Sequence, residues 1–385
     1  MSKTIAIIGG GPAGCMSACH IDKSFDITIF DINSPLKTLL PTGGGKCNLA
    51  HAEFNFKDLA KNYPRGEKFL YSIFSRFGTQ DSLDFFEKIG VKTYVRDDNR
   101  IFPISNSSKD VQEKILAQLK HCKFKKEEVL SIKKIQNGFE IKSNKASYLF
   151  DIVIIAIGGK HGYKLMHDLG HNFEPPRPAL VGLKTNPQYK ELQGVTIKNC
   201  TINSDKKIYT GDILFTDNGI TGPAVFEMSS INAKKDFPYN VTINFLNKDI
   251  NWQEEFNKNP KKDLGNLINE YLPKSFVNEV LKHANIDLKQ KCCMINSNTK
   301  ELVNKILKSH DIQIIGTKKG GETVTCGGLL LDEFNTKTLE SKLHSNLYSC
   351  GEVLNIDGFC GGFNLQACWS TGYVVAQAIN SSSPQ

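Results

Sequence analysis

The chain has 385 residues, of which 40% are hydrophobic and 23% are charged, a composition that excludes a disordered or collagen-like protein. This length predicts at least two domains. The net charge of +8 is compatible with a polyanionic partner such as nucleic acid. The eleven cysteines form no CxxC pair, and no apolar run approaches the ~20 residues of a membrane span. We therefore expect a cytoplasmic protein with reduced thiols, no metal site and no membrane segment.

A strand, a glycine-rich turn, a helix and a second strand follow one another at the start of the sequence. Residues 4–8 form a short apolar strand, and a second strand spans residues 26–30. The helix between them runs to about residue 21. Because this helix must return the chain to the same sheet, the two strands are expected to pair in parallel.

The glycine turn carries a dinucleotide-binding fingerprint. Gly9, Gly11 and Gly14 satisfy GxGxxG directly after the first strand, and Asp31 ends the second strand. Gly9 allows the tight turn, Gly11 lets backbone N–H groups approach a pyrophosphate, and Gly14 lets the helix pack closely. Asp31 is placed to accept hydrogen bonds from a ribose diol. The pattern predicts a dinucleotide site.

Both ends of the sequence contribute to the same sheet. An apolar strand at residues 150–157 runs into Gly158, and a strand at residues 347–350 runs into Gly351 and Glu352. A helix from about residue 365 to residue 379 follows. These elements predict a doubly wound α/β domain assembled from two separated segments.

The pattern of apolar residues changes between residues 175 and 342, and this change predicts an inserted domain. Short alternating segments such as 195–202 and 241–245 indicate antiparallel strands. Residues 251–309 show helical spacing in three places. Residues 250–320 hold 12 Lys and 8 acidic residues. Their difference of +4 is half of the net charge of the whole chain, +8.

Two features favour FAD over NAD. Thr42-Gly43-Gly44-Gly45-Lys46-Cys47-Asn48 is a second glycine loop that an extended dinucleotide could reach. Gly361-Gly362-Phe363-Asn364 begins a helix whose N-terminus could face the flavin pyrimidine carbonyl.

These segments resemble the YhiN/BaiN-like flavoproteins, also called the aminoacetone oxidase family and related to the ribosomal RNA dihydrouridine synthase group. The resemblance spans nearly the whole chain. It rests on the two glycine loops, Ile101-Phe102-Pro103-Ile104-Ser105, Ala156 to Gly159, Leu214 to Pro223, and Gly327 to Gly372.

The resemblance implies a glutathione-reductase-like FAD-binding Rossmann domain interrupted by a β-barrel domain that carries a helical subdomain. We expect the FAD domain at residues 1–178 and 343–385, the barrel at 179–250 and 310–342, and the helices at 251–309. The residues expected to contact FAD are Gly9, Gly11, Pro12, Ala13, Gly14, Asp31, Gly44, Lys46, Cys47, Asn48, Val129, Gly158, Gly351, Glu352, Gly362, Phe363 and Asn364.

Family members reduce conjugated C=C bonds, in bile-acid enones and in a uridine of the large ribosomal RNA, or oxidise amines. The positive excess of the helical insertion favours ribosomal RNA as the substrate, because phosphate contacts supply much of RNA affinity. A small-molecule enone reductase, an amine oxidase and a non-catalytic flavin module stay as alternatives. NAD(P)H is expected as a transient electron donor, with oxygen as the other possible redox partner.

Two residues are predicted to take part in proton transfer. Cys47 lies beside Lys46 in the second glycine loop, where a thiol pKa can be tuned. His161 follows Gly158 and Gly159 closely, and His171 is a further candidate nearby.

Overall fold

The computed structural model describes residues 2–159, 162–246, 248–318 and 324–382. The chain forms two compact units: unit 1 comprises Met1–Arg177 and Thr325–Gln385, and unit 2 comprises Pro178–Val324. Unit 1 is therefore discontinuous. The fold class predicted from the sequence is confirmed: a Rossmann-like α/β domain is interrupted by a segment that contains a closed β-barrel.

A parallel five-stranded sheet forms the centre of unit 1. Its strands, in spatial order, are β19 (Leu347–Ser349), β10 (Ile152–Ile155), β1 (Thr4–Ile8), β2 (Asp26–Asp31) and β6 (Lys123–Lys126). In the register, Ile7 lies between Ile154 and Ile29, and all three side chains are buried. Strands buried on both faces need continuous apolar runs, which is why these segments do not alternate.

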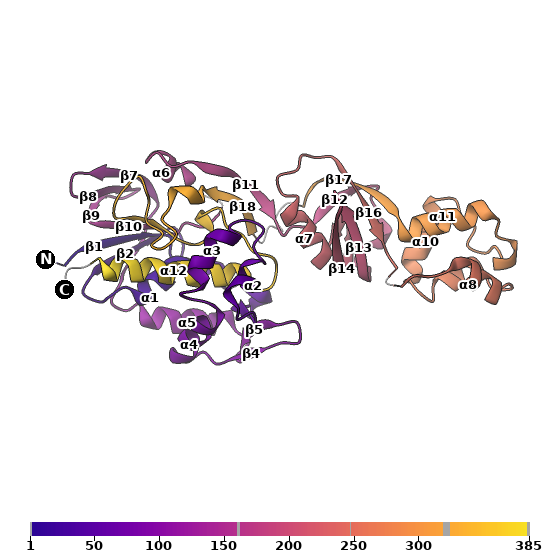
Figure 1. The fold of residues 1–385 in the computed structure, drawn as a ribbon, viewed down its shortest axis with the longest axis horizontal. Helices are drawn as coiled ribbons and strands as arrows, with labels where there is room; N and C mark the ends of the chain where they lie inside the picture. The colour runs from indigo at the N-terminus through magenta and orange to yellow at the C-terminus, as the bar shows by residue number, and fades with distance from the viewer. Residues whose placement is uncertain (1, 160–161, 247, 319–323, 383–385) are drawn as a thin grey trace. The chain divides into compact units, whose positions relative to one another are not determined.

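Two helices cover one face of this sheet side by side (Figure 1): α1 (Pro12–His20) and α12 (Phe363–Ser381). They approach closely because Gly372 has no side chain; a Cβ there would lie 2.5 Å from the carbonyl oxygen of Ala13. Ser17 Oγ donates a hydrogen bond to the carbonyl oxygen of Gly372 at 3.0 Å. Helix α1, near the start of the chain, thus packs against a helix that begins more than 340 residues later in the sequence.

Smaller sheets and helices complete unit 1. The smaller sheets are β3 (Ala50–His51), β5 (Arg100–Pro103) and β4 (Thr93–Val95); β7 (Val129–Ile135), β8 (Gly138–Ser143) and β9 (Ser147–Phe150); and the pair β11 (Phe173–Ala179) and β18 (Val324–Leu329). The other helices are α2 (Phe56–Ala60), α3 (Glu67–Phe74), α4 (Thr79–Lys88), α5 (Ser108–Gln118) and α6 (Tyr163–His167).

The second boundary of the insertion differs from the prediction. Residues 325–342, which we assigned to the barrel, belong to unit 1. Strand β18 pairs with β11, and Glu333 and Ser341 both form hydrogen bonds with His171. These contacts are distant in sequence, so no local pattern identified them.

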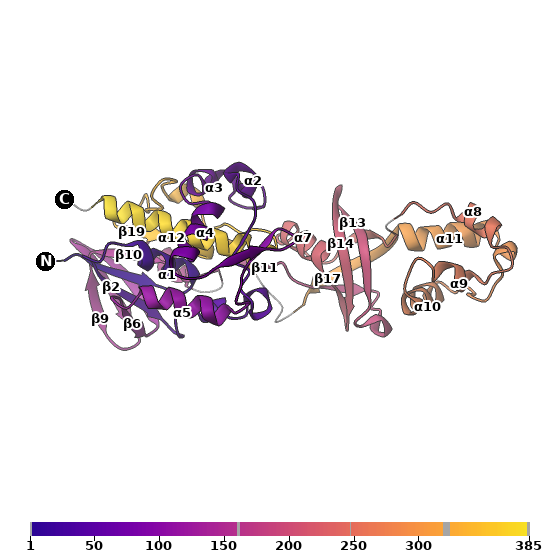
Figure 2. The same ribbon diagram turned by 90° about the horizontal axis from the view of Figure 1, so that it is seen from below.

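Unit 2 is a barrel with the helices of residues 252–308 at one end (Figures 1 and 2). The barrel strands, in spatial order, are β12 (Leu183–Asn186), β15 (Gly219–Thr221), β14 (Lys207–Thr216), β13 (Thr196–Ser204), β16 (Tyr239–Asn244) and β17 (His310–Thr317). The helices of unit 2 are α7 (Pro223–Ile231), α8 (Trp252–Lys258), α9 (Leu264–Ile268), α10 (Lys274–His283) and α11 (Ser297–Lys308). The predicted helical region thus contains four described helices instead of three, and it shares one hydrophobic core with the barrel.

Candidate FAD site

The first glycine turn joins β1 to α1 in a conformation that requires glycine. Gly9 has a φ of +109°, and a Cβ there would lie 2.2 Å from the carbonyl oxygen of Ala156. A Cβ at Gly14 would lie 2.1 Å from the carbonyl oxygen of Gly9. Gly11 differs, because the nearest atom to its Cβ position is 3.8 Å away, so its open side is available to a ligand. The turn thus has the shape of a phosphate-binding loop.

The N-terminus of α1 presents unused backbone donors. Gly11 precedes the helix, Pro12 occupies its first turn, and no side chain caps it. In the described structure, the N–H groups of Ala13 and Gly14 have no hydrogen-bond partner. Unpaired N–H groups and the helix dipole favour an anion at this position.

Asp31 is held at the end of β2 by two backbone donors. Its Oδ2 accepts a hydrogen bond from Gly10 N at 2.8 Å, and its Oδ1 accepts one from Asn33 N at 2.7 Å. These bonds fix the carboxylate beside the glycine turn. Because an ionised carboxylate offers about four lone-pair sites, it retains capacity to accept from a diol.

A cavity of about 160 Å³ joins these elements. Its lining includes eight of the predicted FAD residues: Gly9, Gly11, Pro12, Ala13, Asp31, Gly158, Gly351 and Glu352. The other lining residues are Gly10, Asn33, Ser34, Lys37, Thr38, Ala156, Ile157 and Cys368. Sequence reasoning missed Asn33 to Thr38, although a loop that directly follows the acidic residue of the fingerprint is a reasonable place to look for ribose and phosphate contacts.

The second glycine loop adopts a left-handed backbone that suits glycine, and it is largely open. Gly43, Gly44 and Gly45 all have positive φ, and no atom lies within 4 Å of the Cβ positions of Gly44 and Gly45. Lys46 is exposed. This loop and Lys46 do not line the cavity around Asp31, so they present a separate surface to an extended ligand.

Cys47 is fully buried, with a φ of +62°. Burial raises the pKa of its thiol to about 12, against a smaller opposing effect of a hydrogen bond with Thr42. The thiol therefore stays protonated at neutral pH and has no solvent-exposed surface.

Asn48 connects the second glycine loop to the start of α12. With its amide oriented to satisfy its neighbours, Nδ2 donates to the carbonyl oxygen of Ala50 at 3.0 Å and Oδ1 accepts from Gly362 N at 3.0 Å. The Asn48 side chain therefore positions both segments of the site.

The N-terminus of α12 is a second unpaired helix end. Gly362 has a φ of +100°, and a Cβ there would lie 2.3 Å from the carbonyl oxygen of Ala50. The N–H groups of Phe363, Asn364 and Leu365 have no partner in the described structure. The Asn364 side chain itself holds the preceding turn, donating to the carbonyl oxygen of Gly358 and accepting from its N–H, both at 2.8 Å.

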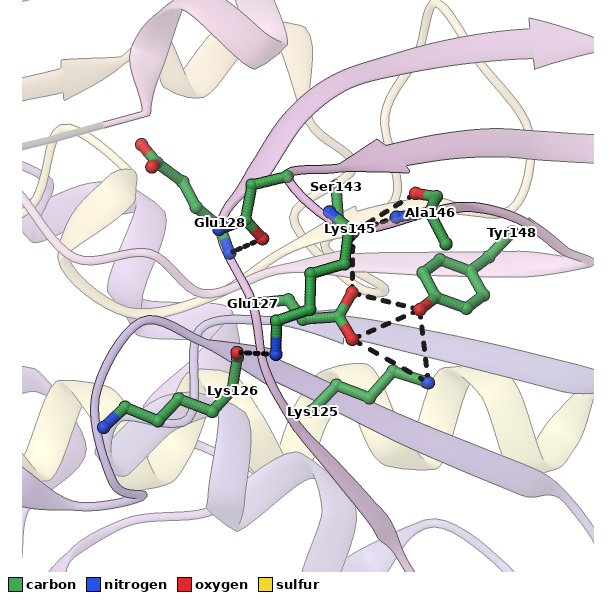
Figure 3. Close-up of polar contacts among 9 residues, drawn as sticks. Lys125, Lys126, Glu127, Glu128, Ser143, Lys145, Ala146 and Tyr148 are labelled. Atoms are coloured by element: carbon green, nitrogen blue, oxygen red, sulfur yellow. Dashed lines mark hydrogen bonds and ion pairs between the residues drawn. The ribbon is translucent and has the colours of Figure 1, made fainter.

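Val129 begins β7 and does not line the cavity. The link between β6 and β7 that precedes it is held by a buried carboxylate, Glu127 (Figure 3). Ser143 Oγ donates to Glu127 Oε2 at 2.6 Å, and the Tyr148 hydroxyl donates to the same oxygen at 3.0 Å. The hydrogen bond from Ser143 is the main cause that lowers the pKa of Glu127. Because Glu127 N donates to the carbonyl oxygen of Asp31 at 3.0 Å, this link is fixed relative to Asp31.

The histidine candidates have different outcomes. His161 lies outside the described residues. His171 is buried, with Nδ1 2.6 Å from Glu333 Oε2 and Nε2 2.8 Å from Ser341 Oγ. Burial lowers the pKa of His171, although Glu333 opposes this effect. Both ring nitrogens are occupied in a structural network, so His171 is not available to a substrate.

FAD fits the residues present. The glycine turn excludes side chains where a pyrophosphate would lie, Asp31 faces the same cavity, and two helix N-termini offer unpaired N–H groups. Among the described His, Cys, Asp and Glu residues, no group of three or more is suited to holding a metal ion. No helix of the described segments has the length and apolarity needed to cross a membrane.

Comparisons with known proteins agree with this geometry. A family model described as "HI0933-like protein Rossmann domain" matches residues 3–378. The chain is 28% identical over 400 residues to the "Ribosomal RNA dihydrouridine synthase" of Escherichia coli, with 97% of each chain covered. It is 27% identical over 407 residues to the "3-dehydro-bile acid delta(4,6)-reductase" of Clostridium scindens, covering 97% of this chain and 98% of the relative.

Among solved structures, 3-ketosteroid delta1-dehydrogenase from Sterolibacterium denitrificans matches with a TM-score of 0.50 and 10% identity, covering 99% of this chain and 100% of the other. This is a likeness of fold alone. The resemblance to the YhiN/BaiN-like flavoproteins is confirmed by the family match, which covers nearly the whole sequence. The chain belongs to the HI0933-like Rossmann family of FAD-dependent oxidoreductases.

Proposed function

We propose that this protein reduces a uridine of 23S-type ribosomal RNA to dihydrouridine, using FAD and reducing equivalents from NAD(P)H. The observation that carries the proposal is the dinucleotide cavity of unit 1, in a chain matched over 97% of its length by a relative named for this reaction. The second relative is named as a reductase of a bile acid. Uracil C5=C6 and a steroid enone share one electronic feature, a C=C bond conjugated to a carbonyl group.

FAD bound in the cavity would supply hydride transfer to the β carbon of such a bond. The protein residues bind and orient the cofactor. The N–H groups of Ala13 and Gly14 would hold its pyrophosphate, and Asp31 would accept from its ribose. The N-terminus of α12 and Lys46 provide positive potential for the pyrimidine end of the flavin.

A single dinucleotide-binding turn in the described structure supports NAD(P)H as a transient electron donor, because FAD would occupy that turn. The glycine pair at Gly219 and Gly222 lacks the spacing of a fingerprint, and Gly219–Thr221 is the barrel strand β15. A resident nicotinamide would need a second Rossmann site, and the described structure contains one glycine turn with an adjoining acidic residue. Cys47 and His161 stay as proposals for the proton donor.

The helical insertion is less available to phosphates than its lysine content implied. Five of its lysines form ion pairs with carboxylates: Lys258 with Glu254 and Glu255, Lys262 with Glu270, Lys291 with Asp263, Lys305 with Asp311, and Lys308 with Asp249. Exposed pairs of this kind are weak because water and salt screen them, so a polyanion can displace them at small cost. In the described structure, the lysines of this region without an ion pair are Lys261, Lys274, Lys282, Lys289 and Lys300, and Lys300 Nζ donates to Gln253 Oε1 at 2.8 Å. The other four are the better candidates for RNA contacts through the insertion.

The decisive experiment combines purified holoenzyme with NADH or NADPH and ribosomal RNA that lacks dihydrouridine, under anaerobic conditions. We expect mass spectrometry of the digested RNA to detect one new dihydrouridine. Parallel reactions contain a steroid enone or aminoacetone, with enone loss and peroxide release measured. RNA that stays unmodified while the flavin is reduced and the enone is consumed would refute the RNA substrate and favour the alternative, a small-molecule flavin oxidoreductase.

A further inference from the structure

The small sheet β3–β5–β4 of unit 1 has one face rich in aromatic and basic side chains. His51 pairs with Arg100 across β3 and β5, and Tyr94 pairs with Phe102 across β5 and β4. Arg96 follows β4 and lies opposite Arg100, whose carbonyl oxygen accepts its N–H at 2.9 Å. Because alternate residues of a strand share a face, these five side chains belong to one face of the sheet. We call it the β3–β5–β4 face.

The rings and guanidinium groups of this face contact one another. The Arg96 guanidinium lies 5.2 Å from the ring centre of Phe102. The rings of Tyr94 and Phe102 are 6.3 Å apart. Phe102 is buried, but Tyr94 is 37% exposed and the Arg96 side chain is 45% exposed. The exposed Tyr94 ring and Arg96 guanidinium thus pack against the buried ring of Phe102.

The β3–β5–β4 face adjoins both segments assigned to the flavin end of the cofactor. On one side, Phe102 Cε1 lies 3.0 Å from the Cβ position of Gly43 in the second glycine loop. On the other side, the His51 ring stacks on Phe363 at 4.5 Å, and its Nδ1 donates to the carbonyl oxygen of Gly361 at 3.1 Å. The face therefore extends outward from the place where the reaction is expected to occur.

The chemistry of the face suits nucleobases better than phosphates. Arg96 and Arg100 are balanced by Asp97 and Asp98, and Asp98 lies 2.7 Å from Arg96 Nη2 and 3.5 Å from Arg100 Nε. This turn has no net charge, so it does not attract a phosphate backbone strongly. Its aromatic and guanidinium planes can stack on the unpaired bases that RNA-binding proteins commonly recognise.

We propose that the β3–β5–β4 face binds unpaired nucleotides next to the uridine that is reduced. This inference rests on the proposed function, because it takes RNA as the substrate. Tyr94 and the two arginines are assigned to stacking on bases, and phosphate contacts are assigned to other surfaces. The face thereby holds single-stranded RNA beside the flavin.

Binding of a fluorescein-labelled single-stranded RNA of twelve nucleotides to the FAD-loaded full chain tests the proposal. Stacking is worth about 1–3 kcal/mol per base, so Tyr94→Leu should weaken binding about 5- to 150-fold. Tyr94→Phe keeps the ring and should bind like wild type. Arg96→Lys and Arg100→Lys keep the charge but lose the plane, and each should weaken binding.

The matched charge control is Lys133→Gln with Lys142→Gln. Both lysines are exposed on the paired strands β7 and β8 and have no ion pair in the described structure. Removing them should reduce binding only at low salt, whereas the loss in Tyr94→Leu should persist when salt is raised. The visible flavin spectrum and the melting temperature of each variant verify that it is folded and loaded.

Equal RNA binding by wild type, Tyr94→Leu and Arg100→Lys would overturn the proposal, as would a wild type that does not bind RNA. Dihydrouridine formation measured on the same preparations separates this result from the proposed function. If wild type and variants form dihydrouridine equally, the proposed reaction is supported and the proposed role of the β3–β5–β4 face is refuted. If RNA binding depends on Tyr94 but no dihydrouridine forms, the proposed role of the β3–β5–β4 face is supported and the proposed reaction is refuted.

Discussion

Replacing Asp31 by Asn should weaken FAD binding beyond the effect of the same change elsewhere in the sheet. Asp31 accepts from Gly10 N and Asn33 N, and it faces the cavity where a ribose would lie. An amide has one acceptor atom and no negative charge, so the variant cannot satisfy both backbone donors and also accept from a ribose. Loss of the charge-assisted hydrogen bond from the ribose costs about 1.5–3 kcal/mol of binding free energy, which is about a 10- to 150-fold increase in the Kd for FAD.

Asp151 provides a matched control at the opposite end of β1. Its Oδ2 accepts from Thr4 N at 2.7 Å and from Thr4 Oγ1 at 2.8 Å, and like Asp31 it is half-buried. Asp151→Asn therefore disturbs the same sheet by the same chemistry, away from the cavity. Fluorescence titration of apoprotein with FAD, together with thermal melting of the apoprotein, compares the two variants. An equal increase in Kd for both variants, or no increase for Asp31→Asn, would refute the assignment of Asp31 to the ribose.

Three further predictions concern other parts of unit 1. Gly14→Val should prevent FAD binding and lower Tm strongly, because its Cβ would lie 2.1 Å from a backbone carbonyl oxygen; normal flavin content after purification would contradict this. Since its hydrogen bonds lower the pKa of Glu127, the carboxylate stabilises the fold above its unfolded pKa and this contribution is lost as pH falls. Wild-type Tm should therefore drop more steeply than that of Glu127→Gln between about pH 5 and pH 3, and parallel curves would show that the network contributes nothing. Ellman's reagent should modify Cys293 and Cys360, which are exposed, well before Cys47, whose buried thiol has a pKa raised to about 12; peptide mapping in which Cys47 reacts first would refute its burial.

The sequence predicted best where local geometry is demanding. The turn from Gly9 to Gly14 needs residues without Cβ at fixed spacing, so its shape can be inferred from adjacent residues alone. The apolar strands and the glycines after β10 and β19 could be predicted for the same reason. These inferences were sufficient to place a cofactor cavity at the carboxyl ends of the strands.

Features that depend on distant pairing could not be predicted. Residues 325–342 belong to unit 1 because β18 pairs with β11 and Ser341 reaches His171, and neither contact leaves a periodic signal. A net charge calculated from the sequence treats every lysine of the helical insertion as unpaired, but the fold places carboxylates next to several of them. The burial of Cys47 is also a tertiary property, since the residues on both sides of it are polar or small.

The pairing of β19 with β10 affects how the protein acquires its cofactor during synthesis. Strand β10 ends at residue 155, and its partner begins at residue 347, after the whole of unit 2 has been made. Gly351, Glu352 and Cys368 line the cavity, so its wall is incomplete until this late segment has left the ribosome. Unit 2 has its own core and can fold earlier, because domains generally fold as units in the order of synthesis. The cavity can thus be completed only after residues 351–368 have been made, and a ribosome stalled within unit 2 would carry a nascent protein that cannot yet enclose a cofactor there.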